Sequence, residues 1–229
     1  MNNVTVLLPV YEEEAALPAV IDEIRGVLPE CAIVAAYTPG RDASQDVLRW
    51  KKVEWVTTIE KGKGNAVRRT LPFIKTEYIV VMDADCTYPA IHILDLLAGL
   101  DDVAMGYRHQ KDKGAMSQTH SFGNYCLSRL ASVLYGKKVH DVCTGMWAFR
   151  REVLAKFMLN STGFTLEADL FVNCMRRGYK IKQVPIQYRC RVDQTKPKVR
   201  ISDGLKIGLF LIRMRCSRRV VTSQLKGMV

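Results

Sequence analysis

The strongest constraint on this chain is an apolar run that leads directly into two aspartates. Residues 78–82 form the run, and Asp83 and Asp85 follow it two positions apart, before Pro89. A continuous apolar run of this length predicts a strand that is buried on both faces, as in a parallel sheet. Open α/β sheets place their ligands at the carboxyl ends of such strands. The two carboxylates are therefore predicted to lie at a ligand site.

Two carboxylates this close repel each other unless a cation neutralises them. Mg²⁺ is commonly held by one or two carboxylates together with substrate phosphates, so Asp83 and Asp85 are candidate metal ligands. An Asp-x-Asp pair also occurs by chance, and an ordinary acidic turn at the end of a strand is the alternative. The segments around the pair favour the metal site.

Apolar runs alternate with helical patterns through the first half of the chain. Strands are predicted at residues 4–10, 31–37, 53–57, 78–82 and 103–106. Helices are predicted at residues 15–28 and 91–100, and between them one helix begins at residue 42 and a separate short helix ends at residue 71. This alternation predicts an α/β fold, with a mostly parallel central sheet and helices on both faces. The polar residues 108–114 are expected to form a loop.

Glycine and lysine alternate in Lys61-Gly62-Lys63-Gly64, immediately before a predicted helix. Glycine lets the backbone approach a ligand, lysine supplies charge, and a helix N-terminus exposes N–H donors. Together these features suit a phosphate group. The spacing is not that of a Walker A loop, and a plain turn is the alternative reading.

The second half of the chain is strongly basic. Residues 1–105 carry a net charge of −6 and residues 106–229 one of +17, which together give the +11 of the whole chain. A basic half suits nucleic acid, an anionic membrane surface or a phosphorylated substrate. Because the first half is acidic and no helix-turn-helix or aromatic-rich basic stripe appears, nucleic-acid binding is disfavoured.

The end of the chain combines apolar and basic residues. After Asp203 there are six Lys or Arg residues and no acidic residue. Residues 201–229 are therefore predicted to form an amphipathic helical segment on a membrane surface, separate from a domain of residues 1–200. A terminal helix that packs on the core, followed by a basic tail, is the alternative. No apolar run reaches the roughly 18 residues that would span a bilayer.

Taken in order, these segments resemble the family 2 inverting glycosyltransferases of the GT-A fold. Within that family they are similar to the dolichyl- and polyprenyl-phosphate mannose and glucose synthases. The resemblance covers nearly the whole chain. It is carried by Leu8-Pro9-Val10-Tyr11-Glu12-Glu13-Glu14, Asp42-Ala43-Ser44-Gln45-Asp46, Lys61-Gly62-Lys63-Gly64, Asp83-Ala84-Asp85, Asp141 with Thr144-Gly145, Glu167-Ala168-Asp169, and Arg191 with Lys196.

The resemblance implies a metal-dependent transfer of a hexose from a nucleotide sugar, of the GDP-mannose or UDP-glucose type, to a polyprenyl or dolichyl phosphate. It implies Mg²⁺ or Mn²⁺ held by Asp85 with Asp83. Donor binding is expected at Pro9, Tyr11, Glu13, Asp42, Lys63, Asp83 and Ala84. Arg108, Arg191 and Lys196 are expected to bind the acceptor phosphate. The catalytic residues are expected to be Asp85, Glu167 and Asp169.

Glu167 or Asp169 would act as a base for a hydroxyl acceptor and would organise the cationic groups for a phosphate acceptor. Other functions remain open at this point. They are transfer to a soluble or glycan hydroxyl, non-catalytic nucleotide-sugar binding, and nucleic-acid binding.

Seven scattered cysteines without a Cys-x-x-Cys pair favour reduced thiols over disulfides or a zinc site. Reduced thiols predict a protein of the cytoplasm. The basic amphipathic segment at residues 201–229 predicts a peripheral position on the cytoplasmic face of a membrane.

Overall fold

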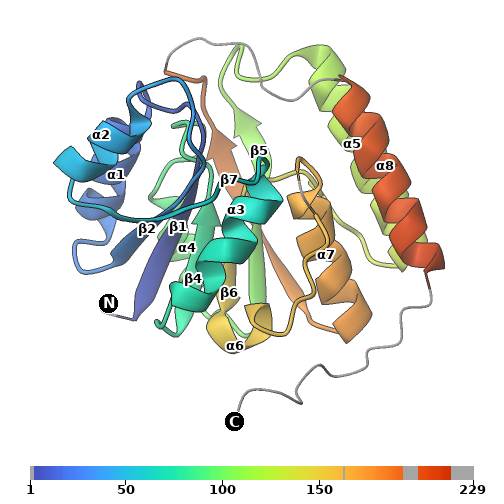
Figure 1. Cartoon of the computed structure of the whole chain (residues 1–229). Helices are drawn as coiled ribbons and strands as arrows, with labels where there is room; N and C mark the ends of the chain where they lie inside the picture. Colours follow the sequence, from blue (N-terminus) through green and yellow to red (C-terminus); the bar gives the residue numbers. More distant parts are fainter. Residues whose placement is uncertain (1–2, 162, 193–200, 218–229) are drawn as a thin grey trace.

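A single mixed sheet forms the centre of the molecule (Figure 1). The computed structural model describes residues 3–161, 163–192 and 201–217. Within them the strands are β1 (Val4–Val10), β2 (Ala32–Tyr37), β3 (Glu54–Thr57), β4 (Tyr78–Met82), β5 (Val103–Lys111), β6 (Met146–Arg150) and β7 (Ile181–Tyr188). Their order across the sheet is β3-β2-β1-β4-β6-β5-β7. Strand β6 is antiparallel to its neighbours β4 and β5, and the other pairs are parallel.

Helices cover both faces of this sheet. They are α1 (Leu17–Val27), α2 (Ser44–Trp50), α3 (Lys63–Thr70), the 3₁₀ helix η1 (Leu71–Phe73), α4 (His92–Leu97), α5 (Gln118–Tyr135), α6 (Arg151–Leu154), α7 (Leu166–Arg177) and α8 (Ile201–Cys216). One core cluster joins the sheet to α1, α2 and α4. The other joins it to α3, α5, α6, α7 and α8. The predicted α/β fold, with a mostly parallel sheet between helices, is confirmed.

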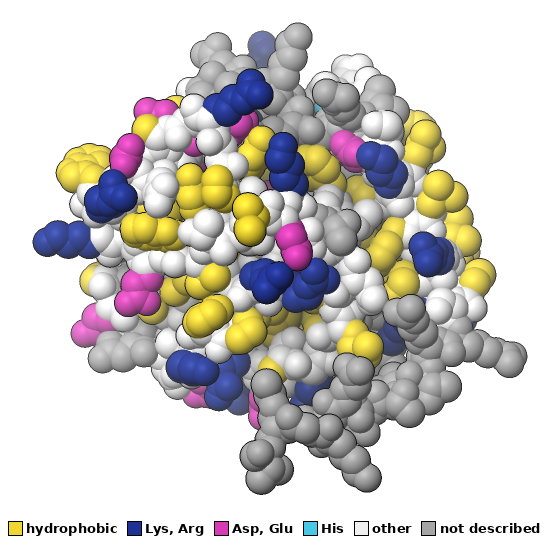
Figure 2. Space-filling view, viewed as in Figure 1, with side chains coloured by type: hydrophobic (Ala, Val, Ile, Leu, Met, Phe, Trp, Pro, Cys, Tyr) yellow, Lys and Arg dark blue, Asp and Glu magenta, His cyan; other side chains and the backbone are white. Residues whose placement is uncertain are grey.

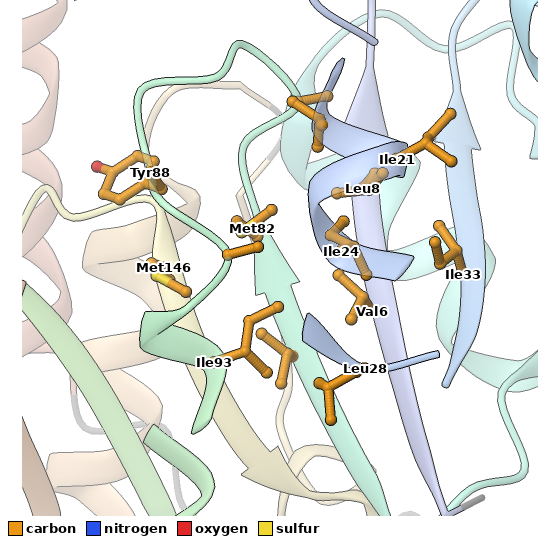
Figure 3. Packing of buried hydrophobic residues seen from close by; sticks show 14 of the residues in the cluster. Val6, Leu8, Ile21, Ile24, Leu28, Ile33, Met82, Tyr88, Ile93 and Met146 are labelled. Atoms are coloured by element: carbon orange, nitrogen blue, oxygen red, sulfur yellow. The ribbon is translucent and has the colours of Figure 1, made fainter. Parts of the chain in front are cut away.

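The central strands are buried on both sides because their side chains alternate between the two clusters. In β1, Val6 and Leu8 point to the α1 side and Leu7 to the α7 side. In β4, Met82 points to the α1 side and Val81 to the α7 side. Figure 3 shows Val6 and Leu8 next to Ile24 of α1, with Met82 of β4 in the same cluster. This two-sided burial explains why both strands are continuous apolar runs in the sequence, and it brings their carboxyl ends to one edge.

Strand β5 corrects one expectation from the sequence. Residues 108–111 were predicted to lie in a loop, but they extend β5 to Lys111 and pair in parallel with β7. The backbone ladder does not depend on side-chain polarity, and the side chains of residues 109–111 are exposed. Arg108 is consequently held on a strand and not on a loop.

Helix α8 packs against α5 and α7 through Ile207, Leu211 and Met214. The described part of the C-terminal segment therefore shares the core of the sheet domain, while residues 218–229 lie outside the described residues. The opposite side of α8 carries exposed Leu205 and Leu209. Figure 2 shows hydrophobic side chains with Lys and Arg among them at this edge. No helix in the described ranges combines the length and the apolar character needed to cross a bilayer.

Candidate active site

A pocket of about 870 Å³ opens at the edge where β1 and β4 end. We call it the main pocket. Its lining comes from the ends of β1 and β4, the start of α3, strand β5, the first half of α5, helix α7 and helix α8. Residues more than 100 positions apart in the chain thus face one cavity. One end of the cavity is charged and the other is apolar.

Lys63 joins two carboxylates at the charged end. It is the first residue of α3, and it follows Gly62, whose φ of 112° is a conformation that glycine adopts without strain. The Lys63 ammonium group forms ion pairs with Asp83 and with Glu167. Burial alone would lower the pKa of Lys63, but the two carboxylates raise it well above its usual range. Lys63 is therefore a permanent positive charge in this pocket.

Asp85 is held by its own turn and by Arg191. Its Oδ1 accepts hydrogen bonds from the Thr87 backbone N–H at 3.1 Å and from the Thr87 hydroxyl at 2.6 Å. Its Oδ2 accepts two from the Arg191 guanidinium, at 2.6 and 3.0 Å. Cys86, between Asp85 and Thr87, has a φ of 64°. Left-handed residues other than glycine concentrate at functional sites, where surrounding contacts hold them.

Carboxylates crowd together at this end, next to two cationic side chains. Lys63 pairs with Asp83 and Glu167, and Arg191 pairs with Asp85 and Glu13. Each of these cations thus contacts two carboxylates. Burial raises the pKa of Asp83 to about 6, Lys63 opposes that rise, and the nearby Asp85 and Glu167 add to it. A further cation would relieve this crowding.

The carboxylates fit a hard divalent ion, because Mg²⁺ and Mn²⁺ both accept carboxylate oxygens. The described residues contain no cluster of three or more His, Cys, Asp or Glu side chains arranged to hold a metal. Among the described residues, Asp83 and Asp85 would therefore need further ligands to complete a coordination shell. Phosphate oxygens are the usual source of such ligands for Mg²⁺.

A buried ion pair forms the wall next to the charged end. Arg108 donates from Nε to Asp141 Oδ2 at 2.6 Å and from Nη2 to Oδ1 at 2.7 Å. Asn124 on α5 also donates to Asp141 Oδ1, at 2.9 Å. Burial would raise the pKa of Asp141, but Arg108 outweighs burial and lowers it. The Arg108 guanidinium lies 5.1 Å from the centre of the Tyr188 ring, a cation–π contact that fixes the arginine in the pocket wall.

The opposite end of the main pocket is apolar. It is formed by the first half of α5, by the segment before α7 and by the first half of α8. Its apolar lining residues are Ala115, Met116, Phe122, Leu127, Phe164, Leu205 and Ile207. Phe122 and Leu205 are about 70% exposed. An apolar lining that stays open to solvent is typical of a ligand-binding groove.

A second cavity of about 780 Å³, the rim pocket, lies beside the first. It is lined by Tyr11, Glu12, Glu14, Ala15, Pro39, Gly40, Arg41, Asp42 and Lys61, and it shares Tyr11 and Lys61 with the main pocket. Asp42 ties its two loops together, because its carboxylate accepts from the Glu14 backbone N–H and the Ser44 hydroxyl. Asp42 thus builds this pocket by holding the loop after β1 against the loop after β2.

The structure brings most of the predicted site residues together. Those that line the main pocket are Pro9, Tyr11, Glu13, Lys63, Asp83, Ala84, Asp85, Arg108, Glu167 and Arg191. Asp42 lines the rim pocket. Lys196 lies outside the described residues.

Asp169 is placed elsewhere, although it lies only two residues after Glu167. It is fully buried in α7 and does not line the main pocket. Its carboxylate accepts from the backbone N–H groups of Asn160 and Ser161 and from the Asn173 amide. Residues i and i+2 of a helix point in different directions. The geometry therefore gives Asp169 the role of holding the turn before α7, and not a role in proton transfer as the sequence suggested.

We expect Asp169 to make stability depend on pH. Burial raises the pKa of Asp169 from 3.8 to about 6, against the opposing hydrogen bonds from Ser161 and Asn160. Between these values the folded state binds more protons than the unfolded state, so this contribution to stability falls as pH rises from about 4 to 6. The loss is on the order of 3 kcal/mol.

Urea unfolding of the wild type and of Asp169→Asn between pH 4 and 7 measures this effect. The variant cannot titrate at this position. The difference in unfolding free energy, wild type minus variant, should therefore decrease as pH rises. A difference that stays constant over the range would contradict the assignment.

Sequence reasoning missed the aromatic floor of the main pocket and the start of α5. The Tyr88 hydroxyl accepts the Gly145 backbone N–H at 2.7 Å, and the Tyr88 and Tyr188 rings meet edge to face at 5.2 Å. No local pattern in the sequence links these residues. The start of α5 did leave a signal, since Ser117 caps it by accepting the His120 backbone N–H, and serine is a favoured N-cap.

The chain is similar in sequence to a protein family and to several known proteins. The model of the family described as glycosyl transferase family 2 matches residues 5–158. A dolichyl-phosphate hexose transferase of Haloferax volcanii is 31% identical, with 96% of each chain covered. A polyprenol monophosphomannose synthase of Mycolicibacterium smegmatis is 27% identical, over 80% of this chain and 76% of its own length.

A solved structure has the same fold. It is glucosyl-3-phosphoglycerate synthase of Mycobacterium tuberculosis, in complex with Mn²⁺, UDP and glucosyl-3-phosphoglycerate. The TM-score is 0.75 at 19% sequence identity, and the match covers 93% of this chain and 80% of that one. At this identity the likeness concerns the fold alone.

Proposed function

The chain belongs to glycosyl transferase family 2, and from this premise we propose that it transfers a hexose from a nucleotide sugar to the phosphate group of a polyprenyl or dolichyl phosphate. One observation carries the proposal. The main pocket joins a charged end, with Lys63, Asp83 and Asp85, to an apolar end between α5 and α8. An acceptor with a phosphate head and an apolar tail matches both ends. The names of the two relatives, one a dolichyl-phosphate and one a polyprenol enzyme, support the same acceptor class.

The donor binds across the two pockets. The rim pocket takes the nucleoside, next to Tyr11 and Asp42, and the diphosphate reaches the charged end of the main pocket. Lys63 stays protonated there and stabilises negative charge on the departing diphosphate. Asp83 and Asp85 would hold Mg²⁺ or Mn²⁺ together with the diphosphate oxygens. A divalent cation at this position supplies further positive charge to the leaving group.

The transfer is a single displacement. An oxygen of the acceptor phosphate attacks the anomeric carbon while the bond from that carbon to the donor diphosphate breaks. The nucleoside diphosphate leaves with the bonding electrons, and the configuration inverts. A phosphate monoester has a second pKa of about 6, so the acceptor is already an anion near neutral pH. Glu167 therefore serves to hold Lys63, with which it is paired, and no base is required.

The acceptor phosphate lies near the pocket wall that contains Arg108, and its tail lies on the apolar lining. Arg108 and Arg191 contribute positive charge to the same pocket. The exposed Leu205 and Leu209 on α8, with Lys206 between them, suit contact with the surface of a membrane that contains the acceptor. We place the protein at the cytoplasmic face of that membrane, as a peripheral enzyme.

An acceptor panel tests the proposal. Radiolabelled UDP-glucose and GDP-mannose are each offered with a polyprenyl phosphate, with the same polyprenol lacking phosphate, and with 3-phosphoglycerate. Each reaction is run with Mg²⁺, with Mn²⁺ and with EDTA. We expect label in the organic phase only with the lipid phosphate and a divalent ion. Comparable transfer to the free alcohol or to the soluble phosphate would overturn the acceptor assignment.

We expect Gly145→Ala to slow transfer by at least tenfold. A methyl group at Gly145 would lie 2.1 Å from Asp83 Oδ2, so the Asp83 carboxylate must move. Small displacements of positioning groups can cost about 100-fold in rate. Gly26→Ala in α1 is the matched control, because a methyl group there meets nothing within 4 Å. Steady-state kinetics of both variants measure the effect, and equal rates for both would contradict the positioning role.

A further inference from the structure

We infer that Arg191 blocks Asp85 to divalent cations in the free protein, and that a bound diphosphate opens the site by drawing Arg191 away. Metal and donor would then bind in a coupled fashion. The inference rests on the proposed function for the identity of the diphosphate. It concerns a step that the proposed function leaves open, namely how the site avoids binding metal without its substrate.

The contacts of Asp85 carry this inference. Both hydrogen bonds to Oδ1 come from Thr87, two residues along the same turn, so this oxygen is occupied by the local backbone. Oδ2 is the oxygen that remains for a ligand, and Arg191 donates to it from both Nε and Nη2. The side chains of Asp85 and Arg191 are only 10% and 17% exposed. A cation that approaches Oδ2 meets a guanidinium group already in place.

Arg191 has a reason to leave when a diphosphate arrives. Its second carboxylate contact, from Nη2 to Glu13 Oε1, is long at 3.5 Å. Both guanidinium bonds to Asp85 end on a single oxygen, whereas a phosphate group offers two oxygens to the planar fork of an arginine. A diphosphate therefore competes for Arg191 in the same pocket. Departure of Arg191 would free Asp85 Oδ2 at the moment when phosphate oxygens become available as further metal ligands.

Lys63 differs from Arg191 in this respect. It pairs closely with both Asp83 and Glu167, whereas the contact of Arg191 with its second carboxylate, Glu13, is long at 3.5 Å. We therefore assign the switch to Arg191 and Asp85. Coupling of this kind is reciprocal, since a diphosphate that raises the affinity for metal must have its own affinity raised by the metal to the same extent.

Direct metal binding to the full-length protein tests the inference without any transfer reaction. Mn²⁺ is titrated into the wild type, and electron paramagnetic resonance reports the free ion, with no nucleotide, with UDP and with GDP. The same titrations are run on Arg191→Gln and on Arg189→Gln. Arg189→Gln is the matched control, because it removes one positive charge only two residues from Arg191. Arg189 itself pairs with Glu23 and not with Asp85.

For the wild type we expect weak Mn²⁺ binding alone and at least tenfold tighter binding with one of the two diphosphates. Arg191→Gln should bind Mn²⁺ alone at least tenfold more tightly than the wild type, which corresponds to about 1.4 kcal/mol, and should gain little from the diphosphate. Arg189→Gln should behave like the wild type. Arg191→Lys, which keeps the charge but not the paired donors, should lie between the wild type and Arg191→Gln and serves if the glutamine variant does not fold.

Three results would overturn the inference. They are equal Mn²⁺ affinity of the wild type and the Arg191 variants, an equal rise in Arg189→Gln, and no effect of either diphosphate on the wild type. The proposed function is judged separately, by transfer to lipid phosphate. An enzyme that transfers hexose but shows no Arg191 effect keeps the function and loses the switch. Coupled Mn²⁺ binding without transfer to lipid phosphate keeps the switch and loses the acceptor assignment.

Discussion

Replacing Lys63 with methionine is expected to lower the rate of hexose transfer by 100-fold to 1,000-fold and to destabilise the fold. The kinetic loss follows from the removal of a fixed positive charge beside the leaving diphosphate, where a single preorganised group is commonly worth such a factor. The structural loss follows from the two carboxylates, Asp83 and Glu167, that Lys63 joins. Without Lys63 both are left partly buried and unpaired, at a cost of about 3 kcal/mol.

A double variant separates these two effects. In Lys63→Met with Glu167→Gln, one of the orphaned charges is removed, so we expect part of the stability to return while transfer stays slow. The destabilisation of Lys63→Met should also shrink as pH falls towards 5. The reason is that the pKa of Asp83 is already raised to about 6, and loss of Lys63 raises it further, so that protonation neutralises the unpaired carboxylate. Urea unfolding and steady-state kinetics on the same samples give both quantities. Normal transfer by Lys63→Met would contradict the role of Lys63.

The largest loss of stability is expected from Asp141→Asn. The side chains of Arg108 and Asp141 are 8% and 4% exposed, and two hydrogen bonds join them. Removal of one partner of a buried ion pair leaves the other charge uncompensated and typically costs 3–5 kcal/mol. We expect the unfolding free energy to fall by about 4 kcal/mol, and the melting temperature to fall by about 8–16 °C for a chain of this size.

Asp46→Asn provides the control for this prediction. Asp46 pairs with Arg49 on the surface of α2, where the two side chains are 73% and 66% exposed, and such pairs contribute about 0–1 kcal/mol. Replacement of both buried partners, in Arg108→Met with Asp141→Leu, should destabilise less than Asp141→Asn alone, because no charge is then left buried. A loss of unfolding free energy below 1 kcal/mol in Asp141→Asn would contradict the stabilising role of the buried Arg108–Asp141 ion pair. Urea unfolding of all three variants decides the matter.

Local patterns predicted the elements that one stretch of sequence specifies. The apolar run at residues 78–82 is β4, and the run at residues 4–10 is β1, each with the predicted bounds. Both strands are set by burial, which the sequence records directly. The end of β5 and the insertion of antiparallel β6 between β4 and β5 depend on partners that are distant in the chain. Periodicity carries no information about such partners.

The same limit applies to the site. Residue type and spacing identified Lys63, Asp83 and Asp85 as functional candidates, and the family resemblance added Arg191. The pairings among them were not predictable, since Glu167 lies 104 residues from Lys63 and Arg191 lies 106 residues from Asp85. Helical geometry does separate Glu167 from Asp169, because residues two apart on a helix face different directions. That consideration was available in the sequence and would have removed Asp169 from the catalytic set.

The central claim is that the charged end and the apolar end of the main pocket act on one acceptor molecule. The most direct test is kcat/KM for prenyl phosphates that share one head group and increase in length by single isoprene units. We expect kcat/KM to rise over the first units and then to level off, and we expect Leu205→Asp, on the apolar lining, to flatten the rise while the shortest acceptor reacts as with the wild type. A rate that does not depend on chain length in the wild type would contradict the claim.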